Sequence, residues 1–303
     1  MRRLLAILLA LAALPAWAQV KYPVPNNLKA GSSHPDASSV VWAGAYKHWI
    51  MTTQTQFYVF DVNGTLLTST TGSIYAGNST SDHEGSAVIA CSGSNTDRFW
   101  VQSESGAGMS EYDIDDFDAT NNATPTEAKR VLWSGQCGLD GANEEGLAFY
   151  PDAAASACLY GGYFLIGRQD TGNAAKICIP SGASFPYNLV AGDCIVQNQD
   201  DPCTMSEVAG LDYDFDTGLV YWQSDNDQKV CTSYPSALGT QVGSTISDLD
   251  TTNTWESVAV APGRMAYAED GTGGSSPCQI GGTTTGCGLW LYDIRARRKG
   301  LTR

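Results

Sequence analysis

The sequence predicts an all-β fold: a five-bladed β-propeller with disulfide-stapled loops, with a six-bladed propeller as the alternative. Three observations support this prediction. Long helical periodicity is absent, short alternating or aromatic-rich runs recur between small polar residues, and a three-step unit occurs five times in order. A recurring four-strand unit of roughly 40 to 50 residues is typical of propeller blades.

The first step of the unit is an acid followed by small and apolar residues. The five copies begin at Asp36, Glu84, Glu145, Glu207 and Glu256. These acids follow one another at intervals of 48, 61, 62 and 49 residues. The longer intervals predict insertions in the loops.

The second and third steps are strand-like runs. The second is aromatic and ends in polar residues: His48–Gln54, Phe99–Glu104, Tyr163–Gln169, Leu219–Asp225 and Arg264–Asp270. The third comprises Phe57–Asp61, Met109–Ile114, Ala175–Ile179, Lys229–Tyr234 and Gly288–Asp293. A weaker fourth run follows in several units, as at Val131–Ser134 and Asn188–Ala191. Because the chain ends soon after the last third step, we expect Val20–Leu28 to supply the missing outer strand and cover an open sheet edge.

The amino-terminal residues predict a secretory signal peptide. Arg2 and Arg3 precede an apolar run over residues 4–14, and Ala16-Trp17-Ala18 resembles a cleavage site. We therefore interpret residues 1–18 as a signal peptide and 19–303 as one propeller domain, secreted or periplasmic in a bacterial host. The apolar run is too short to span a bilayer comfortably, and no other stretch resembles a membrane span.

Nine cysteines follow this segment, which predicts disulfides formed in an oxidising compartment. The closely spaced pairs Cys194/Cys203, Cys278/Cys287 and Cys158/Cys178 are the expected staples. Since nine is odd, one thiol is left over, and we expect it to be Cys231. The absence of a CxxC motif argues against zinc binding and thiol redox chemistry.

The net negative charge of the chain limits the classes of molecule that it is expected to bind. Without Arg2 and Arg3, 15 basic residues face 32 acidic residues. Such a field repels nucleic acids and anionic membranes and attracts cations. We expect a monomer that acts on a small-molecule or polymeric substrate.

Several runs resemble known propeller families. The run from Glu207 to Asp225 resembles a blade of the YWTD or gluconolactonase-type propellers. Asn143–Phe149 and Trp255–Pro262 resemble strands of secreted esterase-like phytase propeller domains. These motifs are short and shared among many propellers, so the resemblance implies a fold and carries no assigned activity.

In a propeller, the five leading acids would converge on the central channel. Carboxylates that meet in a partly desolvated channel repel one another, so some hold a proton or a cation offsets their charge. Calcium suits oxygen ligands of irregular geometry, and Glu84, Glu145, Glu207, Glu256 and Asp36 are its expected ligands. The structural alternative is that each carboxylate accepts backbone N–H bonds from the next blade and locks the ring.

Two of the three histidines lie near leading acids. His34 precedes Asp36 by two residues, and His83 directly precedes Glu84. A histidine at the channel mouth would serve as a general base beside a metal-activated water, whereas the structural alternative is a surface histidine. We therefore take His83, His34 and Glu145 as the candidate catalytic residues.

Two further acidic sets have alternative interpretations. Glu104, Asp225, Glu269 and Asp270 end second steps and suggest a second ring of the kind that glycoside hydrolysis requires. The alternating acids of Asp212–Gly218 place their glycine one residue too late for an EF-hand loop, which favours a hairpin.

The leading functional hypothesis is an exported calcium-dependent hydrolase of phosphoester or lactone/ester substrates at the central channel. Its rival is a non-catalytic binding propeller for a glycan, peptide or envelope partner. The sequence does not decide between an enzyme and a binding protein.

Overall fold

The structure is a computed structural model of the whole chain. It describes residues 20–23, 37–44, 46–53, 56–65, 67, 74–75, 83–90, 97–103, 107–117, 125–247, 254–270, 279–280, 283–284 and 288–293. The expected signal peptide, His34, Asp36, Cys91, Cys278 and Cys287 lie outside the described residues.

The described chain forms largely antiparallel sheets in sequence order. The first contains β2 (Ala37–Ala43), β3 (His48–Thr53), β4 (Gln56–Asp61) and β5 (Ile74–Tyr75). The second contains β6 (His83–Ile89), β7 (Arg98–Ser103), β8 (Gly108–Asp113), β9 (Glu127–Leu132) and β13 (Tyr187–Asn188). The third contains β10 (Glu144–Pro151), β11 (Gly162–Arg168), β12 (Asn173–Ile177) and β14 (Cys194–Asp200).

Two more sheets complete the sequence order. One contains β15 (Gly210–Asp214), β16 (Leu219–Ser224), β17 (Lys229–Tyr234) and β18 (Ala237–Gln241). The last contains β19 (Thr254–Ala261), β20 (Arg264–Asp270), β23 (Gly288–Asp293) and β1 (Val20–Pro23), and β21 (Gln279–Ile280) pairs with β22 (Thr283–Thr284) as a small ribbon. Short 3-10 turns occur at η2 (Ile114–Phe117), η3 (Ala153–Ala155), η4 (Leu159–Gly161) and η5 (Ala191–Asp193).

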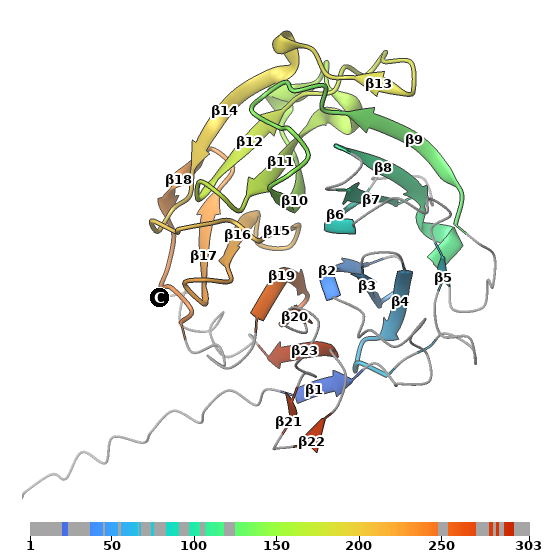
Figure 1. Cartoon of the computed structure of the whole chain (residues 1–303), viewed down its shortest axis with the longest axis vertical. Coiled ribbons are helices and arrows are strands. Elements are labelled where there is room, and N and C mark those ends of the chain that lie inside the picture. The colour runs from blue at the N-terminus through green and yellow to red at the C-terminus, as the bar shows by residue number, and fades with distance from the viewer. Residues whose placement is uncertain are drawn as a thin grey trace, which may run out of the picture.

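The first strand of each sheet lies at the centre of the molecule (Figure 1). These inner strands contact one another in the order β2, β6, β10, β15 and β19, and β19 contacts β2 again. The all-β propeller that the repeat predicts is therefore confirmed.

Packing between neighbouring sheets follows from the two-residue period of a strand. Val40 packs toward the last sheet with Trp49 and Ala259, whereas Val41 packs toward the second sheet with Phe99. Five clusters of buried side chains fill the spaces between neighbouring sheets in this way. The strands thus bury side chains on both faces, which explains why the sequence alternation is weak in the aromatic second steps.

The prediction of five four-stranded blades is wrong, because only four of the described sheets have four strands. Four sheets have the four strands of a standard blade, and the remaining large sheet has five. The extra strand is β13, an insertion from the third unit that runs parallel to β9. Leu189, directly after it, donates its backbone N–H to the Leu132 carbonyl at 2.9 Å. Within the described residues, the only other sheet is the two-stranded ribbon, so nothing there supports the six-bladed alternative.

The prediction for the outer strand of the third unit is wrong. Asn188–Ala191 was expected to be this strand, but Asn188 belongs to β13 and the outer strand is β14. The residues of β14 are mostly exposed or half-buried, because an outer strand packs little of its surface. Its sequence therefore lacks the apolar pattern that reveals the inner strands.

The amino-terminal strand completes the last sheet, as predicted. Val20 pairs with Leu291 and Pro23 pairs with Gly288, both in an antiparallel register. The last sheet thus combines β1 with strands from the other end of the described chain, and its outer edge is covered.

Three disulfides are formed among the described cysteines, and they correct two of the expected assignments. Cys158–Cys178 is confirmed. Cys194 pairs with Cys137 and not with Cys203, which pairs instead with Cys231, the thiol expected to be free. The pairings join segments that sheet formation brings together, so proximity in sequence was misleading. The disulfides support the expected oxidising compartment.

Among the described residues, no helix has the length and apolar character needed to cross a membrane.

Candidate ligand site at the carboxyl ends of the inner strands

Three of the leading acids occupy the same structural position. Glu84, Glu145 and Glu256 each lie at a β-bulge near the start of an inner strand, between the paired residues that flank the register shift. Each side chain is half-buried. The repeat therefore identified equivalent positions in these three sheets, as bulges are a means of redirecting side chains.

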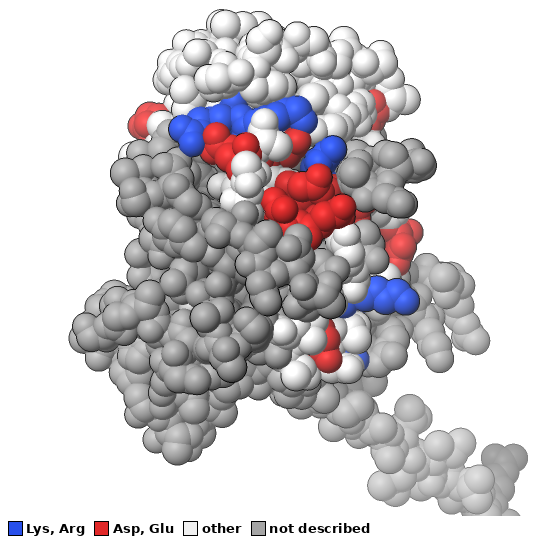
Figure 2. All heavy atoms as spheres, turned by 90° about the vertical axis from the view of Figure 1, so that its right-hand side faces the viewer, with Lys and Arg blue, Asp and Glu red and all other residues white. Residues whose placement is uncertain are grey.

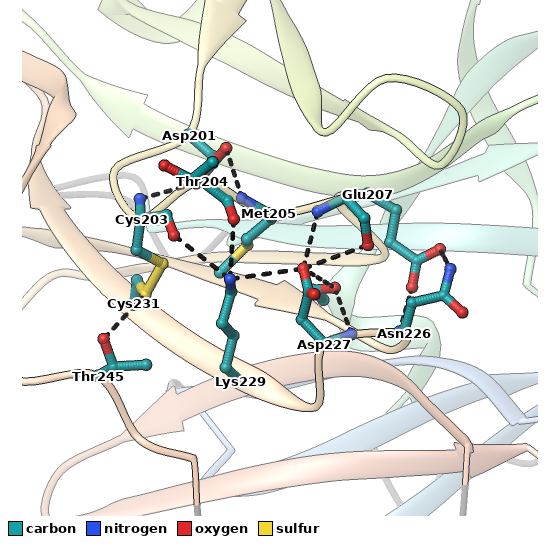
Figure 3. Close-up of polar contacts among 12 residues, drawn as sticks. Asp201, Cys203, Thr204, Met205, Glu207, Asn226, Asp227, Lys229, Cys231 and Thr245 are labelled. Atoms are coloured by element: carbon teal, nitrogen blue, oxygen red, sulfur yellow. Dashed lines mark hydrogen bonds and ion pairs between the residues drawn. A yellow bond between two sulfur atoms is a disulfide. The ribbon is translucent and has the colours of Figure 1, made fainter.

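Glu207 does not share this position, because it lies three residues before β15 begins at Gly210. Its buried carboxylate accepts hydrogen bonds from the backbone N–H and the side-chain amide of Asn226 (Figure 3). Burial raises the pKa of Glu207, with neighbouring Asp225 acting in the same direction and the bonds from Asn226 opposing it. Both carboxylate oxygens thus fasten the segment before β15 to the β16–β17 turn.

The rest of this network is also a fastening between loops (Figure 3). Lys229 Nζ donates to the Thr204 carbonyl at 2.9 Å and lies 3.5 Å from a carboxylate oxygen of Asp227. Asp201 accepts from the backbone N–H of Cys203 at 2.7 Å. The Cys203–Cys231 disulfide joins the same two segments covalently.

The predicted metal ring is not gathered in what the structure describes. No group of three or more His, Cys, Asp or Glu side chains among the described residues is placed to hold a metal ion. Asp36 lies outside them, so the calcium site stays a prediction.

His83 is nearly enclosed by aromatic packing. Its side chain is 3% exposed, and its ring stacks on Phe57 with centroids 5.2 Å apart. A general base must reach the proton that it removes, and His83 offers little surface for that. The catalytic roles of His83, His34 and Glu145 stay predictions.

Glu144 is buried and caps a loop. The sequence predicted its neighbour Glu145, and not Glu144, as a candidate residue. Its two carboxylate oxygens accept the backbone N–H groups of Asp140 and Gly141, each at 2.8 Å. Asp225, from the proposed second acidic ring, accepts the Trp255 N–H at 2.7 Å. Glu144 thus holds its own loop, and Asp225 joins neighbouring sheets. Neither is a leading acid, so the structural alternative for the leading acids stays a prediction.

A cavity of about 570 Å³ opens at the carboxyl ends of the inner strands, away from the leading acids near the strand starts. It is bounded by the turns that follow β2, β6, β15 and β19, where each inner strand passes to the second strand of its sheet. Its lining residues are Val41, Trp42, Gly44, Lys47, Val62, Val88, Ala90, Asp97, Asp212, Tyr213, Asp214, Phe215, Asp216, Val260, Ala261, Pro262 and Arg264. This volume lies in the range of small-molecule sites.

The walls of the cavity are largely apolar and aromatic. Trp42 is half-buried and packs against Trp49 with ring centroids 4.7 Å apart. Tyr213 and Phe215 meet edge to face at 4.9 Å, and Phe215 is 44% exposed. Aromatic surface that is held in place but left open is well suited to packing against a ligand.

The β15–β16 hairpin contributes acidic side chains to the cavity. The hairpin prediction for Asp212–Gly218 is confirmed, since Asp214 pairs with Leu219 across the β15–β16 turn. Asp214 holds that turn by accepting the Asp216 N–H at 2.9 Å and the Thr217 hydroxyl at 2.6 Å. The sequence allowed a calcium-binding loop for these acids and favoured the hairpin; it suggested no role for them in a binding site for an organic ligand.

Asp212 is the most perturbed acid of the cavity. It is half-buried, and its Oδ2 accepts the Val260 N–H of the neighbouring inner strand at 2.6 Å. Burial raises the pKa of Asp212 to about 8, and nearby Asp214 raises it further, while the backbone bonds lower it. The carboxyl therefore retains its proton at neutral pH.

This protonation predicts a pH dependence of folding stability. The unfolded chain ionises Asp212 near its ordinary pKa of 3.8, whereas the folded chain does so near 8. Relative to Asp212→Asn, the wild-type free energy of unfolding should be highest below about pH 4 and fall by at most about 1.4 kcal/mol per pH unit up to about pH 8. Denaturant unfolding of both proteins at intervals from pH 4 to 9 measures this difference, and a difference that rises with pH contradicts it.

Basic and acidic side chains also meet outside the cavity. Figure 2 shows basic and acidic side chains lying next to one another on one side. Ion pairs of this kind join Arg98 to Asp113 at 3.0 Å and Arg130 to Glu127 at 2.7 Å, on β7 to β9. In each of these pairs the two charges offset one another, so the pairs themselves do not mark a binding site.

Neither a protein-family model nor a curated protein matches the sequence. The crystal structure of Myxococcus xanthus glutaminyl cyclase is similar with a TM-score of 0.46 and 15% identity, over 83% of this chain and 90% of that chain. The luciferin-regenerating enzyme is similar with a TM-score of 0.43 and 8% identity, over 89% and 95% of the two chains. A chain of a nidogen–laminin complex reaches 0.42 and 10%, over 77% and 72%. These similarities are too distant to bear on function, and the resemblance to esterase-like phytases and gluconolactonases stays a prediction.

Proposed function

We propose that this protein binds a small organic ligand in the cavity at the carboxyl ends of β2, β6, β15 and β19. The observation that carries the proposal is the combination of a volume of about 570 Å³, aromatic walls and charged side chains from four sheets. Apolar walls supply affinity by excluding water, and a few placed polar groups fix the orientation of a ligand. This function is closest to the binding alternative that the sequence left open.

Packed strands support the cavity. The inner strands that carry it are buried between packed sheets, and Asp212 links β15 directly to β19. A preorganised site loses less conformational entropy when a ligand binds.

Filling the cavity mouth tests the proposal. A Cβ atom at Gly44 would meet only Trp42, at 3.7 Å or more, and Gly44 is an exposed residue of the cavity lining, so we expect Gly44→Trp to fold and to fill part of the cavity. Nile red, an uncharged aromatic dye that fluoresces in apolar sites, should bind the native wild type saturably and bind Gly44→Trp at least about tenfold more weakly. Fluorescence titration measures both affinities.

Gly182→Trp is the matched control, because Gly182 has open space around it and does not line the cavity. It should bind the dye like the wild type. Absence of saturable binding, or equal binding by Gly44→Trp, contradicts the proposal.

Hydrolysis is a second candidate function, favoured by one observation. A carboxyl that stays protonated at neutral pH is suited to general-acid catalysis, and Asp212 is such a group on the cavity wall. Lactone, ester and phosphoester substrates should then be turned over by the wild type and not by Asp212→Asn or Gly44→Trp. Loss of activity on calcium removal and in Glu145→Gln, with Asp212→Asn still active, would instead favour the calcium hydrolase at the leading acids.

A further inference from the structure

The charges of the cavity are separated around the propeller axis. Lys47 and Arg264 come from the first and last sheets, whose inner strands β2 and β19 are in contact. Asp97 comes from the second sheet, and Asp214 and Asp216, the hairpin acids that carry charge, come from the β15–β16 hairpin of the fourth. One arc of the rim is therefore positive, and the arcs that flank it are negative.

The positive arc is equipped to hold a carboxylate. The Arg264 guanidinium donates to the Val62 carbonyl and lies 3.4 Å from the Asn63 side-chain oxygen, which orients the group and uses part of its five N–H donors. Lys47 is exposed at the β2–β3 turn with three donors of its own. No ion pair joins either side chain to a carboxylate within the part of the chain described by the structure.

The negative arcs are equipped to hold an ammonium group beside aromatic faces. Asp216 is exposed on the turn next to Phe215, and Tyr213 precedes it on the same hairpin. Carboxylates attract a cation, and aromatic faces add a cation–π contribution of about 0.5–1 kcal/mol at exposed sites. Asp97 contributes a further carboxylate from across the cavity.

Neither a simple cation nor a simple anion satisfies this arrangement. A cation meets repulsion from Lys47 and Arg264, and an anion meets repulsion from the hairpin acids and Asp97. We propose that the ligand is a small zwitterion, with an ammonium group, a carboxylate and an apolar or aromatic body, bound with its carboxylate toward Lys47 and Arg264 and its ammonium group toward Asp216. This inference rests on the proposed function and specifies its ligand class.

Blocked dipeptides test each charge separately. The probe is a dipeptide of alanine and phenylalanine with free ends, compared with its N-acetyl and C-amide forms by calorimetric titration at low salt. The free form should bind, and each blocked form should bind at least about tenfold more weakly, because each lacks one charge-assisted contact.

Paired variants assign the two ends. Arg264→Gln should weaken binding of the free dipeptide about tenfold and leave binding of the C-amide form, which has no carboxylate, unchanged. Asp216→Asn should also weaken binding of the free dipeptide about tenfold, and it should leave binding of the N-acetyl form, which has no ammonium group, unchanged. Arg130→Gln and Asp170→Asn change the same charges outside the cavity and should bind like the wild type.

The outcomes separate this inference from the proposed function. In one outcome, the dye binds the wild type and not Gly44→Trp, but the free and blocked dipeptides bind equally well or no dipeptide binds. This outcome excludes a zwitterionic ligand and leaves the cavity as a binding site. If neither dye nor dipeptide binding responds to Gly44→Trp, both proposals are wrong.

Discussion

Replacing Gly85 by alanine is expected to lower the free energy of unfolding by about 3 kcal/mol, the upper end of the usual cost of overpacking. A Cβ atom at this position would lie 2.4 Å from the Glu145 carbonyl oxygen and 2.6 Å from the Leu147 nitrogen. Both are backbone atoms of β10, so no side-chain rotation relieves the contact. The inner strands β6 and β10 must separate, which weakens the ring on both sides.

Denaturant unfolding of Gly85→Ala and Gly182→Ala makes the comparison. Gly182 has no neighbouring atom within 4 Å of an added Cβ, so its variant should stay within about 0.5 kcal/mol of the wild type. Similar stabilities of the two variants would show that the inner strands do not pack as closely as the structure has them.

Removal of the Cys137–Cys194 disulfide by Cys137→Ala with Cys194→Ala is expected to cost about 4 kcal/mol by the chain-entropy relation. The bond closes a loop with a sequence separation of 57 residues, and its loss gives the unfolded chain more freedom. It also releases the segment before β10 from the outer strand β14 of the same sheet.

The double variant Cys158→Ala with Cys178→Ala provides the comparison. Its separation of 20 residues predicts a smaller loss, about 3 kcal/mol. Unfolding in denaturant of both variants without reductant measures the difference. Equal losses, or a greater loss from the shorter loop, would contradict the loop-length explanation and indicate strain or residual structure in the unfolded chain.

The repeat made most of the fold predictable. Inner and second strands are buried on both faces, and their apolar and aromatic residues mark them clearly, as in Val40, Trp100 and Trp222. Outer strands pack less, so β14 carried no comparable pattern and β13 was assigned to the wrong sheet. The acidic positions were predictable where a bulge begins an inner strand, as at Glu84 and Glu145, and not where a similar motif precedes the strand, as at Glu207.

The amino-acid sequence alone determined the all-β class, the repeating unit and the use of the amino-terminal segment as the last outer strand, because these depend on local pattern and order along the chain. Only the tertiary structure decided the disulfide partners and the cavity. Lys47, Asp97, Asp212 and Arg264 belong to four different hairpins, where Lys47 lies in a turn and Asp212 and Arg264 lie in strands. They share one cavity because the inner strands end together around a common axis, a proximity that no local pattern records.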